Sequence, residues 1–562
     1  MIIAPTDEGV FLRWREGEGE QPIRKERFVS FSDFRPYFFV KREDATVERK
    51  VVSDKWNRRN DFTFEYEHDV AVDLYGNSLS KVYFAPSHPK HMREARSAFP
   101  QTFEADVSHH HRYAVDEMDE IPEYRFRKWY WDMEWQQGGQ HNGAITCIVV
   151  YDNYNEEFYE YVWFPENKLQ YMVSIRDIKG KKVITKRFHE EKTMILTFLE
   201  DIKQDDPDML ISWFGNQFDL PKLLERCVEN DLDARIISPK GEITGYFPTK
   251  TGFSFRKEAF SPIEQPVKGR ITLNLDLAFE RQWNDSQRGT LPSLSLDYIS
   301  TEVLGEKKLV SKKFPDKSDF FARAWLEDTL TYLHYALIDV DLIRRIDEEN
   351  FTSEAIISLQ RLLKAPFDAC FYASHMGGIY FMRNASWKAP TGSKGERVDY
   401  DGAMVYDPLA AGTNGLHLGV AAFDFAGLYP SMMIARNISW ETKSNNPTEF
   451  AVNIFTPKDF SDVENTKMMY YKTDELGLLP RAVLELKELR NEYKRNMKRA
   501  ESKSEYAKWN NNQLAVKRLM ASFYGIIAYQ GFGWADVDLA ASITASAREA
   551  IREAAFKVRQ LS

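Results

Sequence analysis

The middle of the chain contains CIVVYD (Cys147–Asp152), DMLISWF (Asp208–Phe214) and ITLNLDL (Ile271–Leu277). Each of these apolar runs has the length and the composition of a buried strand. Helical patterns, such as Lys192–Lys203 and Pro221–Asn230, separate them. Strands that alternate with helices are typical of a mixed central sheet covered by helices. The sequence therefore predicts an α/β domain between Tyr124 and about Asp341.

The segments on either side predict further domains. The runs RFVSF and PYFFVKRED alternate with polar turns before residue 104, and APTGSKGERVDYDG (389–402) indicates a loop into another unit. Two long helical patterns between Leu479 and Ile527, joined near Ala500–Tyr506, predict an antiparallel helical hairpin. We expect a small mixed N-terminal domain (1–104), the α/β domain (105–345), a helical return to the N-terminal domain (346–388), the first part of a further domain (389–475), the hairpin (476–530) and a second segment of that further domain (531–562).

Composition indicates a multidomain, globular, soluble protein. The 562 residues predict roughly three or four packed units at ~100–200 residues per domain. Apolar residues make up 43% of the chain, and no segment approaches the ~20 consecutive apolar residues of a membrane helix. The start MIIAPTDEGV lacks a basic leader, so no secretory signal is expected. Three scattered cysteines, Cys147, Cys227 and Cys370, indicate buried thiols in a reducing compartment. We therefore expect a cytoplasmic protein, in the host cytoplasm if a phage encodes it.

The net charge is negative and argues against a nucleic-acid partner, whereas the distribution of charge along the chain favours one. The net charge is −10, whereas Arg481–Met520 holds 11 Lys or Arg against 5 Glu. A cationic arm on an acidic body is consistent with phosphate binding. A solvated hairpin with ion pairs along its faces is the alternative interpretation.

Three acidic elements in the α/β region predict a metal site. Trp131-Asp132-Met133-Glu134-Trp135 places two carboxylates at i and i+2, on one face of a strand. Asn216-Gln217-Phe218-Asp219 follows a strand and precedes a helix, and Tyr335 and Asp339 lie four residues apart on a helix. Taken singly, these elements are also consistent with a strand edge, a helix cap and a surface acid. Together they offer the bridging carboxylates that two-metal phosphodiester hydrolysis requires.

In order and spacing these elements resemble the three Exo motifs of the proofreading 3′→5′ exonucleases of the DEDD superfamily, in its Tyr-bearing branch. The segment LPSLSLDYIS (Leu291–Ser300) is similar to the one between the second and third motifs. The resemblance implies an RNase H-like exonuclease domain. It implies that Asp132, Glu134, Asp219 and Asp339 hold two Mg²⁺ or Mn²⁺ ions, that Tyr335 orients the attacking water, and that Asn216 and Phe218 contact DNA.

A second set of motifs follows. Asp424-Phe425-Ala426-Gly427-Leu428-Tyr429-Pro430-Ser431, which we expect at the end of an apolar strand, resembles motif A of family B DNA polymerases, with Gly427 in place of the usual Ser. Lys517-Arg-Leu-Met-Ala521-Ser-Phe-Tyr524-Gly resembles motif B, with Ala521 where the family has Asn. The resemblance identifies segments 389–475 and 531–562 as palm and segment 476–530 as fingers.

The resemblance implies roles for these residues in a polymerase site with two metal ions. Asp424 and the Phe425 carbonyl bind metal, Leu428 and Tyr429 form the nucleotide pocket, and Tyr429 excludes a 2′-hydroxyl. Arg490, Lys494 and Lys517 hold the triphosphate, and Tyr524 lies near the nascent base pair. Ala521 belongs to the same nucleotide site and lacks one polar contact that the family's Asn makes. Tyr400-Asp-Gly402-Ala resembles the Y-x-G-G/A loop that guides the primer strand, so Tyr400 and Gly402 are expected to bind DNA.

The resemblance stops before motif C, whose form is Y-G-D-T-D-S, and before the thumb, because neither occurs in the 562 residues. We expect a polymerase completed by a second polypeptide that carries both. An artificial truncation or a partial gene product is the alternative.

The expected partners are primer–template DNA, single-stranded 3′ ends, deoxynucleotides and, in replication, a sliding clamp. Two other functions stay open: a standalone exonuclease whose palm and fingers only bind DNA, and a noncatalytic replication scaffold. The sequence leaves the source organism, the clamp, processivity, fidelity and uracil sensing undetermined.

Overall fold

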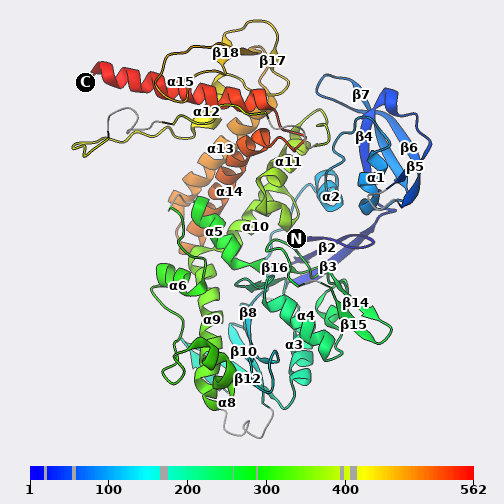
Figure 1. The fold of residues 1–562 in the computed structure, drawn as a ribbon, viewed down its shortest axis with the longest axis vertical. Helices are drawn as coiled ribbons and strands as arrows, with labels where there is room; N and C mark the ends of the chain where they lie inside the picture. The colour runs from blue at the N-terminus through cyan, green and yellow to red at the C-terminus, as the bar shows by residue number, and fades with distance from the viewer. Residues whose placement is uncertain are drawn as a thin grey trace. The chain divides into compact units, whose positions relative to one another are not determined.

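The computed structural model describes residues 1–17, 22–53, 58–164, 175–256, 258–285, 289–392, 398–405 and 414–561. Residues 393–397 of the predicted loop into the further domain lie outside this set. The described chain forms two compact units, each built from two segments (Figure 1). The first unit comprises Met1–Ser30 and Glu117–Phe371, and the second unit comprises Phe31–Asp116 and Tyr372–Ser562.

The first thirty residues differ from the predicted N-terminal domain, because they pack with the α/β domain. Strands β1 (Ile2–Pro5), β2 (Gly9–Glu16) and β3 (Ile23–Ser30) form an antiparallel sheet. The buried side chain of Arg13 pairs with Asp206, and Arg15 donates to Asp208 over 2.8 Å. Buried charges are stable only when they are paired, so these contacts fix the sheet to the first unit.

A seven-stranded mixed sheet forms the centre of the first unit, as predicted. Its order is β11-β12-β10-β9-β8-β13-β16. Its strands are β8 (Lys128–Trp135), β9 (Ile145–Asp152), β10 (Glu157–Trp163), β11 (Ile175–Ile178), β12 (Lys181–Phe188), β13 (Met209–Ser212) and β16 (Ile271–Asn274). Every residue of β9 is buried, since a central strand has both faces covered. Strand β8 pairs with β13 in parallel and with β9 in the antiparallel sense.

Helices and a small hairpin complete the first unit. The α-helices are α3 (Glu191–Asp205), α4 (Asp219–Glu229), α5 (Leu275–Asp285), α6 (Leu296–Leu304), α7 (Lys317–Asp319), α8 (Trp325–Glu327), α9 (Thr329–Asn350) and α10 (Thr352–Leu363). The hairpin is β14 (Tyr246–Thr249) with β15 (Gly252–Phe255), and the short helical turns are Ala234–Ile237, Phe320–Ala324 and Phe367–Phe371. The prediction that all of ITLNLDL is a strand was wrong, because α5 begins at Leu275.

The second unit begins with an antiparallel sheet of order β4-β7-β6-β5. Phenylalanines Phe38, Phe62, Phe64 and Phe84 from three of its strands pack in one buried cluster. The elements are β4 (Tyr37–Lys41), β5 (Arg49–Ser53), β6 (Arg59–Val72), β7 (Ser78–Ala85), α1 (Met92–Arg96) and α2 (His109–Glu117), with short turns at Arg42–Asp44 and Pro89–His91.

The rest of the second unit is mainly helical. Its elements are α11 (Ala373–Asn384), α12 (Leu428–Ala435), α13 (Leu478–Arg499), α14 (Lys503–Ala528), α15 (Val537–Leu561) and the strands β17 (Lys443–Ser444), β18 (Phe450–Asn453) and β19 (Met468–Tyr471). Helices α13 and α14 lie side by side as the predicted hairpin (Figure 1), and Ser502 caps α14 by accepting from the Glu505 amide over 3.0 Å. Helix α11 packs on α14 at Gly377, where an added Cβ would lie 1.8 Å from Cδ1 of Ile526.

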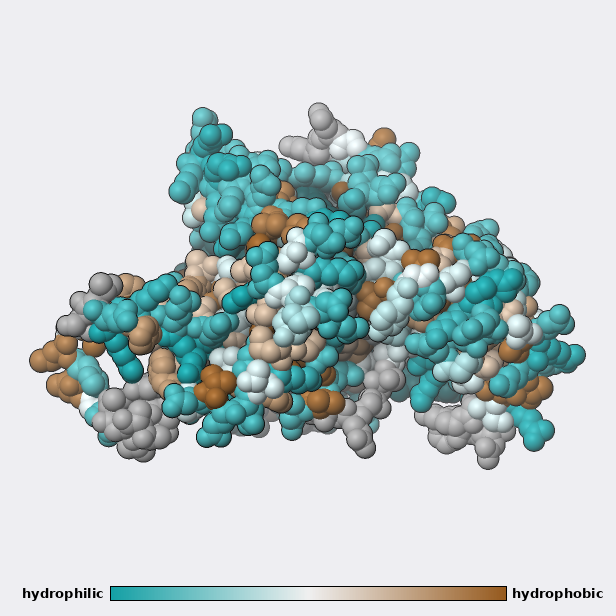
Figure 2. Space-filling model, turned by 90° about the horizontal axis from the view of Figure 1, so that it is seen from above, coloured by the Kyte–Doolittle hydropathy of each residue, from teal (hydrophilic) through white to brown (hydrophobic). Residues whose placement is uncertain are grey.

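The predicted apolar strand before Asp424 does not form. Residues 414–425 pair with no strand in the described part of the chain. Their apolar side chains stand in solvent, with Leu416 90%, Leu418 88% and Phe423 86% exposed. In Figure 2 hydrophobic side chains gather at the left edge of the face shown. The pattern of alternating apolar residues is that of a strand, but a strand needs a partner for its main-chain hydrogen bonds.

Among the described helices, none has the length and apolar character that crossing a membrane requires.

Candidate active sites

Three carboxylates of the first unit converge from two elements that are distant in sequence. Asp132 and Glu134 point to the same face of β8, since they lie two residues apart on a strand. Asp339 comes from α9, which packs on β8 and β9. Carboxylate oxygens of the three residues all lie within 4.8 Å of one another. Asp339 and Glu134 are buried and Asp132 is partly exposed, so the cluster opens toward solvent on one side.

A fourth carboxylate joins the cluster at the turn between β13 and α4. Asp219 is the first residue of α4, is 4% exposed and is hydrogen-bonded to the side chain of Asp132. The N-terminal turn of a helix favours a negative charge. The turn is tight, because a Cβ at Gly215 would lie 1.7 Å from the Ser212 hydroxyl.

The electrostatics of the cluster are unfavourable without a cation. Burial, and then the charge of Asp339, raise the pKa of Asp132 to about 7. Burial and the charge of Asp132 also raise the pKa of Glu134 and the pKa of Asp219 well above the ordinary range. Oδ1 of Asp339 is buried and has no hydrogen-bond partner among the described residues.

These observations fit a site for divalent cations. All the donors are carboxylate oxygens, the ligands that Mg²⁺ and Mn²⁺ prefer and that zinc sites use less. Neighbouring carboxylates repel each other unless a positive charge lies between them. A bound cation would also give the Asp339 oxygen the partner that the protein does not supply.

Lys308 is a residue of this site that the sequence did not indicate. It lies in the loop after α6, and its ammonium contacts Oδ2 of Asp339 at 2.5 Å and the Tyr335 hydroxyl at 3.3 Å. Burial alone would lower the pKa of Lys308, but the charges of Asp339, Tyr335 and Asp132 together outweigh burial and raise this pKa above the ordinary value. Tyr335 is also packed edge-on against Phe320, with ring centroids 5.2 Å apart. The phenol of Tyr335 is therefore held at the edge of the carboxylate cluster.

Three predicted tyrosines of the second unit also come together. The hydroxyls of Tyr400 and Tyr524 are 3.0 Å apart, and the rings of Tyr429 and Tyr524 have centroids 4.8 Å apart. Tyr429 is the second residue of α12, Tyr524 lies on α14 and Tyr400 comes from the loop before α12. Gly402 belongs to the same loop, and its carbonyl accepts from Arg548.

A group of cations lies along the facing helices α13 and α14. The pKa of Lys494 is lowered, first by the charge of Arg490, then by burial and by the charges of Lys498 and Lys517. Arg490 is oriented by a hydrogen bond from Nε to Gln513, at 3.1 Å. Because a bound polyanion would relieve the repulsion between these cations, their arrangement favours binding of a polyanion.

Asp424 belongs to none of the groups of acidic or histidine side chains that could hold a metal ion among the described residues. Asp424, Phe425 and Ala521 are exposed, and Leu428 is the first residue of α12. Gly427 takes a φ of +69° just before α12, a conformation that a residue with a side chain adopts only with strain. The glycine at this position thus matches the local backbone.

Comparisons with known proteins agree with this geometry. The sequence model of the exonuclease domain of DNA polymerase family B matches residues 89–260, and the model of DNA polymerase family B itself matches residues 342–561. The chain belongs to DNA polymerase family B.

Similar relatives of this family B chain include archaeal and eukaryotic DNA polymerases. It is 28% identical over 404 residues to a DNA polymerase of Pyrococcus glycovorans, covering 68% of this chain and 47% of that protein. It is 24% identical over 585 residues to DNA polymerase 1 of Pyrococcus abyssi, covering 97% of this chain and 67% of that protein. The chain thus spans about half to two thirds of the length of the relatives it matches.

A solved structure confirms the fold. The family B DNA polymerase of Pyrobaculum calidifontis superimposes with a TM-score of 0.67 and 18% sequence identity, over 100% of this chain and 72% of that one. The predicted α/β multidomain architecture of family B with an exonuclease domain is confirmed.

Two residues predicted to contact DNA differ in their surroundings. Asn216 is buried, and its amide nitrogen donates to the carbonyls of Ser261, Pro262 and Glu264 over 3.2, 3.4 and 2.8 Å. Asn216 thereby joins the segment Ser261–Glu264 to the turn that carries Asp219. Phe218 is 59% exposed, and its contact with DNA stays a prediction.

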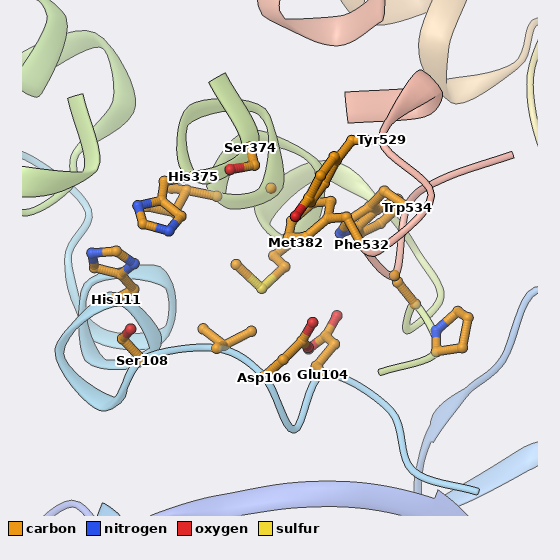
Figure 3. A pocket seen from close by; sticks show the side chains of 16 residues that line it. Glu104, Asp106, Ser108, His111, Ser374, His375, Met382, Tyr529, Phe532 and Trp534 are labelled. Atoms are coloured by element: carbon orange, nitrogen blue, oxygen red, sulfur yellow. The ribbon is translucent and has the colours of Figure 1, made fainter. Parts of the chain in front are cut away.

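The second unit of the family B chain also contains a cavity of about 280 Å³ (Figure 3). Tyr529, Phe532 and Trp534 lie on one side of it and His111 and His375 on the other, with ring centroids of the two histidines 5.0 Å apart. Its carboxylates are those of Glu104, paired with Arg112 at 2.8 Å, and Asp106. These residues lie outside all of the predicted motifs.

The raised pKa values predict how stability depends on pH in metal-free protein. Asp132 titrates near pH 4 when unfolded and near pH 7 when folded, so between these values the folded state binds more protons. Stability must therefore fall as pH rises from about 4 to about 7. We expect thermal unfolding in EDTA to occur at a lower temperature at pH 8 than at pH 5.5.

Added Mn²⁺ tests whether this effect belongs to the carboxylate cluster. Mn²⁺ should raise the unfolding temperature more at pH 8 than at pH 5.5, because ions bind the deprotonated carboxylates. Asp132→Asn should reduce both effects. Equal gains at the two pH values in the wild type would contradict the assignment.

Proposed function

We propose that the first unit is a 3′→5′ exonuclease that removes nucleotides from DNA 3′ ends. The observation that carries the proposal is the convergence of Asp132, Glu134, Asp219 and Asp339 on one opening, beside the phenol of Tyr335. Two Mg²⁺ or Mn²⁺ ions at these carboxylates would activate water and stabilise the leaving oxygen.

The protein side chains have separate tasks in this reaction. Asp132 and Glu134 on β8 provide a rigid ligand pair. Strand β8 cannot shift without breaking its main-chain hydrogen bonds to β9 and β13. Tyr335 orients a water by its hydroxyl, while Lys308 holds Asp339 and Tyr335 in place through one ammonium. In the absence of metal, the same ammonium offsets part of the repulsion within the cluster.

We further propose that the second unit is the palm and fingers of a template-directed DNA polymerase. Arg490, Lys494 and Lys517 bind the triphosphate of a deoxynucleotide, and Tyr429 packs against Tyr524, which follows Lys517 on the same helix α14. A triphosphate needs its charge neutralised while its α-phosphorus is attacked. The family match and the described tyrosine cluster both support this assignment.

Completion of the polymerase site requires a carboxylate from outside the 562 residues. Asp424 is exposed, and the apolar side chains that precede it, from Leu416 to Phe423, are exposed in a segment that forms no strand in the described chain. A strand hairpin that bears the second acid would give this segment a pairing partner and cover its apolar side chains. That hairpin is supplied either by a continuation of the same chain or by a second polypeptide.

The first experiment incubates the chain alone with a 5′-labelled primer–template, Mg²⁺ and four deoxynucleotides. The expected result on a gel is shortening of the primer without extension. Extension should appear once the chain is completed with the acid-bearing segment. Extension by the 562 residues alone would contradict the requirement for completion, and an unchanged primer would contradict the exonuclease assignment.

A separate prediction concerns sugar selection in the completed polymerase. Tyr429→Ala removes the ring that packs on Tyr524, and ribonucleotide incorporation should rise by about a hundredfold because a 2′-hydroxyl then fits. Single-nucleotide insertion kinetics with dATP and ATP measure the ratio. Tyr506→Ala, an exposed tyrosine of α14, is the matched control. If Tyr429→Ala discriminated between dATP and ATP as well as the wild type does, the role of Tyr429 in excluding ribonucleotides would be refuted.

A further inference from the structure

Arg548, on α15, is fully buried and donates to four main-chain carbonyls. Its Nε bonds to Thr456 at 2.7 Å, and its Nη2 bonds to Ile454 at 3.2 Å. Its Nη1 bonds to Asp401 at 2.8 Å and to Gly402 at 2.5 Å. The two pairs of acceptors belong to different segments, the loop after Tyr400 and the turn that follows β18. One planar guanidinium therefore joins three parts of the second unit.

This buried cation forms no ion pair with a carboxylate in the part of the chain that the structure describes. Burial lowers the pKa of Arg548, as expected for a charge removed from water. An apolar side chain could fill the same space without that cost. What the guanidinium adds is a fixed fork of donors, which an apolar residue or a lysine cannot reproduce.

The loop that Arg548 holds carries one of the three clustered tyrosines. Tyr400 immediately precedes Asp401, and its hydroxyl lies 3.0 Å from that of Tyr524. Thr544, one turn before Arg548 on α15, donates to the same Asp401 carbonyl at 2.7 Å. The main chain next to Tyr400 is thus fixed by two side chains of one helix face.

We propose that Arg548 is a positioning residue for the incoming nucleotide, because it holds the Tyr400 loop so that Tyr400, Tyr524 and Tyr429 form one rigid wall. The inference rests on the proposed polymerase function of the second unit. Arg548 itself does not touch the nucleotide. It acts through the Tyr400–Tyr524 hydrogen bond, and its loss lets Tyr524 and the ring of Tyr429 move.

The test is a double-mutant cycle in the completed polymerase, with KM and kcat for dATP insertion as readouts. Arg548→Met removes the four hydrogen bonds at similar side-chain length, and Tyr400→Phe removes the hydroxyl contact alone. Arg552→Met is the matched control. Arg552 lies one turn further along α15 and also donates to main-chain carbonyls, including that of Ser461 at 2.7 Å, but not to the Tyr400 loop.

We expect Arg548→Met to raise KM for dATP by roughly tenfold with a smaller change in kcat, and Arg552→Met to change KM by less than about twofold. Tyr400→Phe should raise KM in the same direction, and the double variant Arg548→Met/Tyr400→Phe should be no worse than Arg548→Met. Arg548→Lys should not rescue, since one ammonium cannot reach both segments. Multiplicative effects of the two substitutions, or equal effects of Arg548→Met and Arg552→Met, would overturn the proposal.

Two further measurements keep the outcome interpretable. If Arg548→Met does not fold, Thr544→Val, which removes one hydrogen bond to the loop, must raise KM in the same direction, and an unchanged KM overturns the inference. Asp424→Asn separates failure of the proposed polymerase site from failure of the role proposed for Arg548. If that variant still extends primers, Asp424 is not a metal ligand of the polymerase site, and the proposed site fails together with the role of Arg548 in it. If Asp424→Asn abolishes extension while Arg548→Met has no effect, only the inference fails.

Discussion

Simultaneous replacement of Asp132 by Asn and Glu134 by Gln is expected to lower the exonuclease rate by about a thousandfold or more. Residues that act as a unit at a reaction centre have effects of this size. The substitutions are nearly isosteric, so the β8–β9 pairing through Asp132 and Val149 should persist. Release of labelled nucleotide from the 3′ end of single-stranded DNA in Mg²⁺ measures the rate.

A matched control replaces two other glutamates of the first unit, at the start of strand β10 of the same sheet. Glu156 and Glu157 pair with Lys181 and Lys182 and lie outside the carboxylate cluster. The variant Glu156→Gln/Glu157→Gln should retain activity within about twofold, because exposed ion pairs contribute little. DNA affinity in EDTA should be unchanged in both double variants. Exonuclease activity within tenfold of wild type for Asp132→Asn/Glu134→Gln would refute the metal-site assignment. If the same variant also lost DNA binding, the alternative of a noncatalytic replication scaffold would stay open.

In EDTA, the variant Asp132→Asn/Glu134→Gln is expected to unfold at a higher temperature than the wild type. Burial and the charge of Asp132 raise the pKa of both Glu134 and Asp219 within the carboxylate cluster, and the variant removes that charge. Catalytic clusters of this kind are strained in the absence of their ions. The gain should disappear when the wild type is saturated with Mn²⁺.

The second large effect is expected for Asp424→Asn in the completed polymerase. Primer extension should fall by about a thousandfold or more, because a two-metal site loses a shared ligand. The exonuclease rate should stay unchanged, since Asp424 belongs to the second unit and the exonuclease carboxylates belong to the first. A gel that separates shortened from extended primers reports both activities in one reaction.

Asp462→Asn is the control for this experiment. Asp462 is another exposed acid of the second unit and belongs to no predicted motif. It should extend primers like the wild type. Retained extension by Asp424→Asn would show that the predicted motif A does not bind metal, and a parallel loss of exonuclease activity would show that the two units do not act independently.

Local chemistry was readable from the sequence because it depends on short spacings. The i, i+2 spacing of Asp132 and Glu134 is enough to place both on one face of a strand. The i, i+4 spacing of Tyr335 and Asp339 is enough to place them on one face of a helix, and α9 confirms that helix. The hairpin of α13 and α14 followed from periodicity for the same reason. Family B membership followed from motifs that are themselves such spacings.

The tertiary structure decided the features that depend on chain segments far apart. Lys308 and the neighbouring Lys307 look alike in sequence, and only the path of the loop after α6 brings Lys308 to Asp339. Arg13 and Arg15 assign the first strands to the α/β unit through partners nearly 200 residues away. The residues before Asp424 carry the pattern of a strand, yet they form none in the described chain. A helix satisfies its own main-chain hydrogen bonds, whereas a strand depends on a partner, and that partner cannot be read from the strand itself.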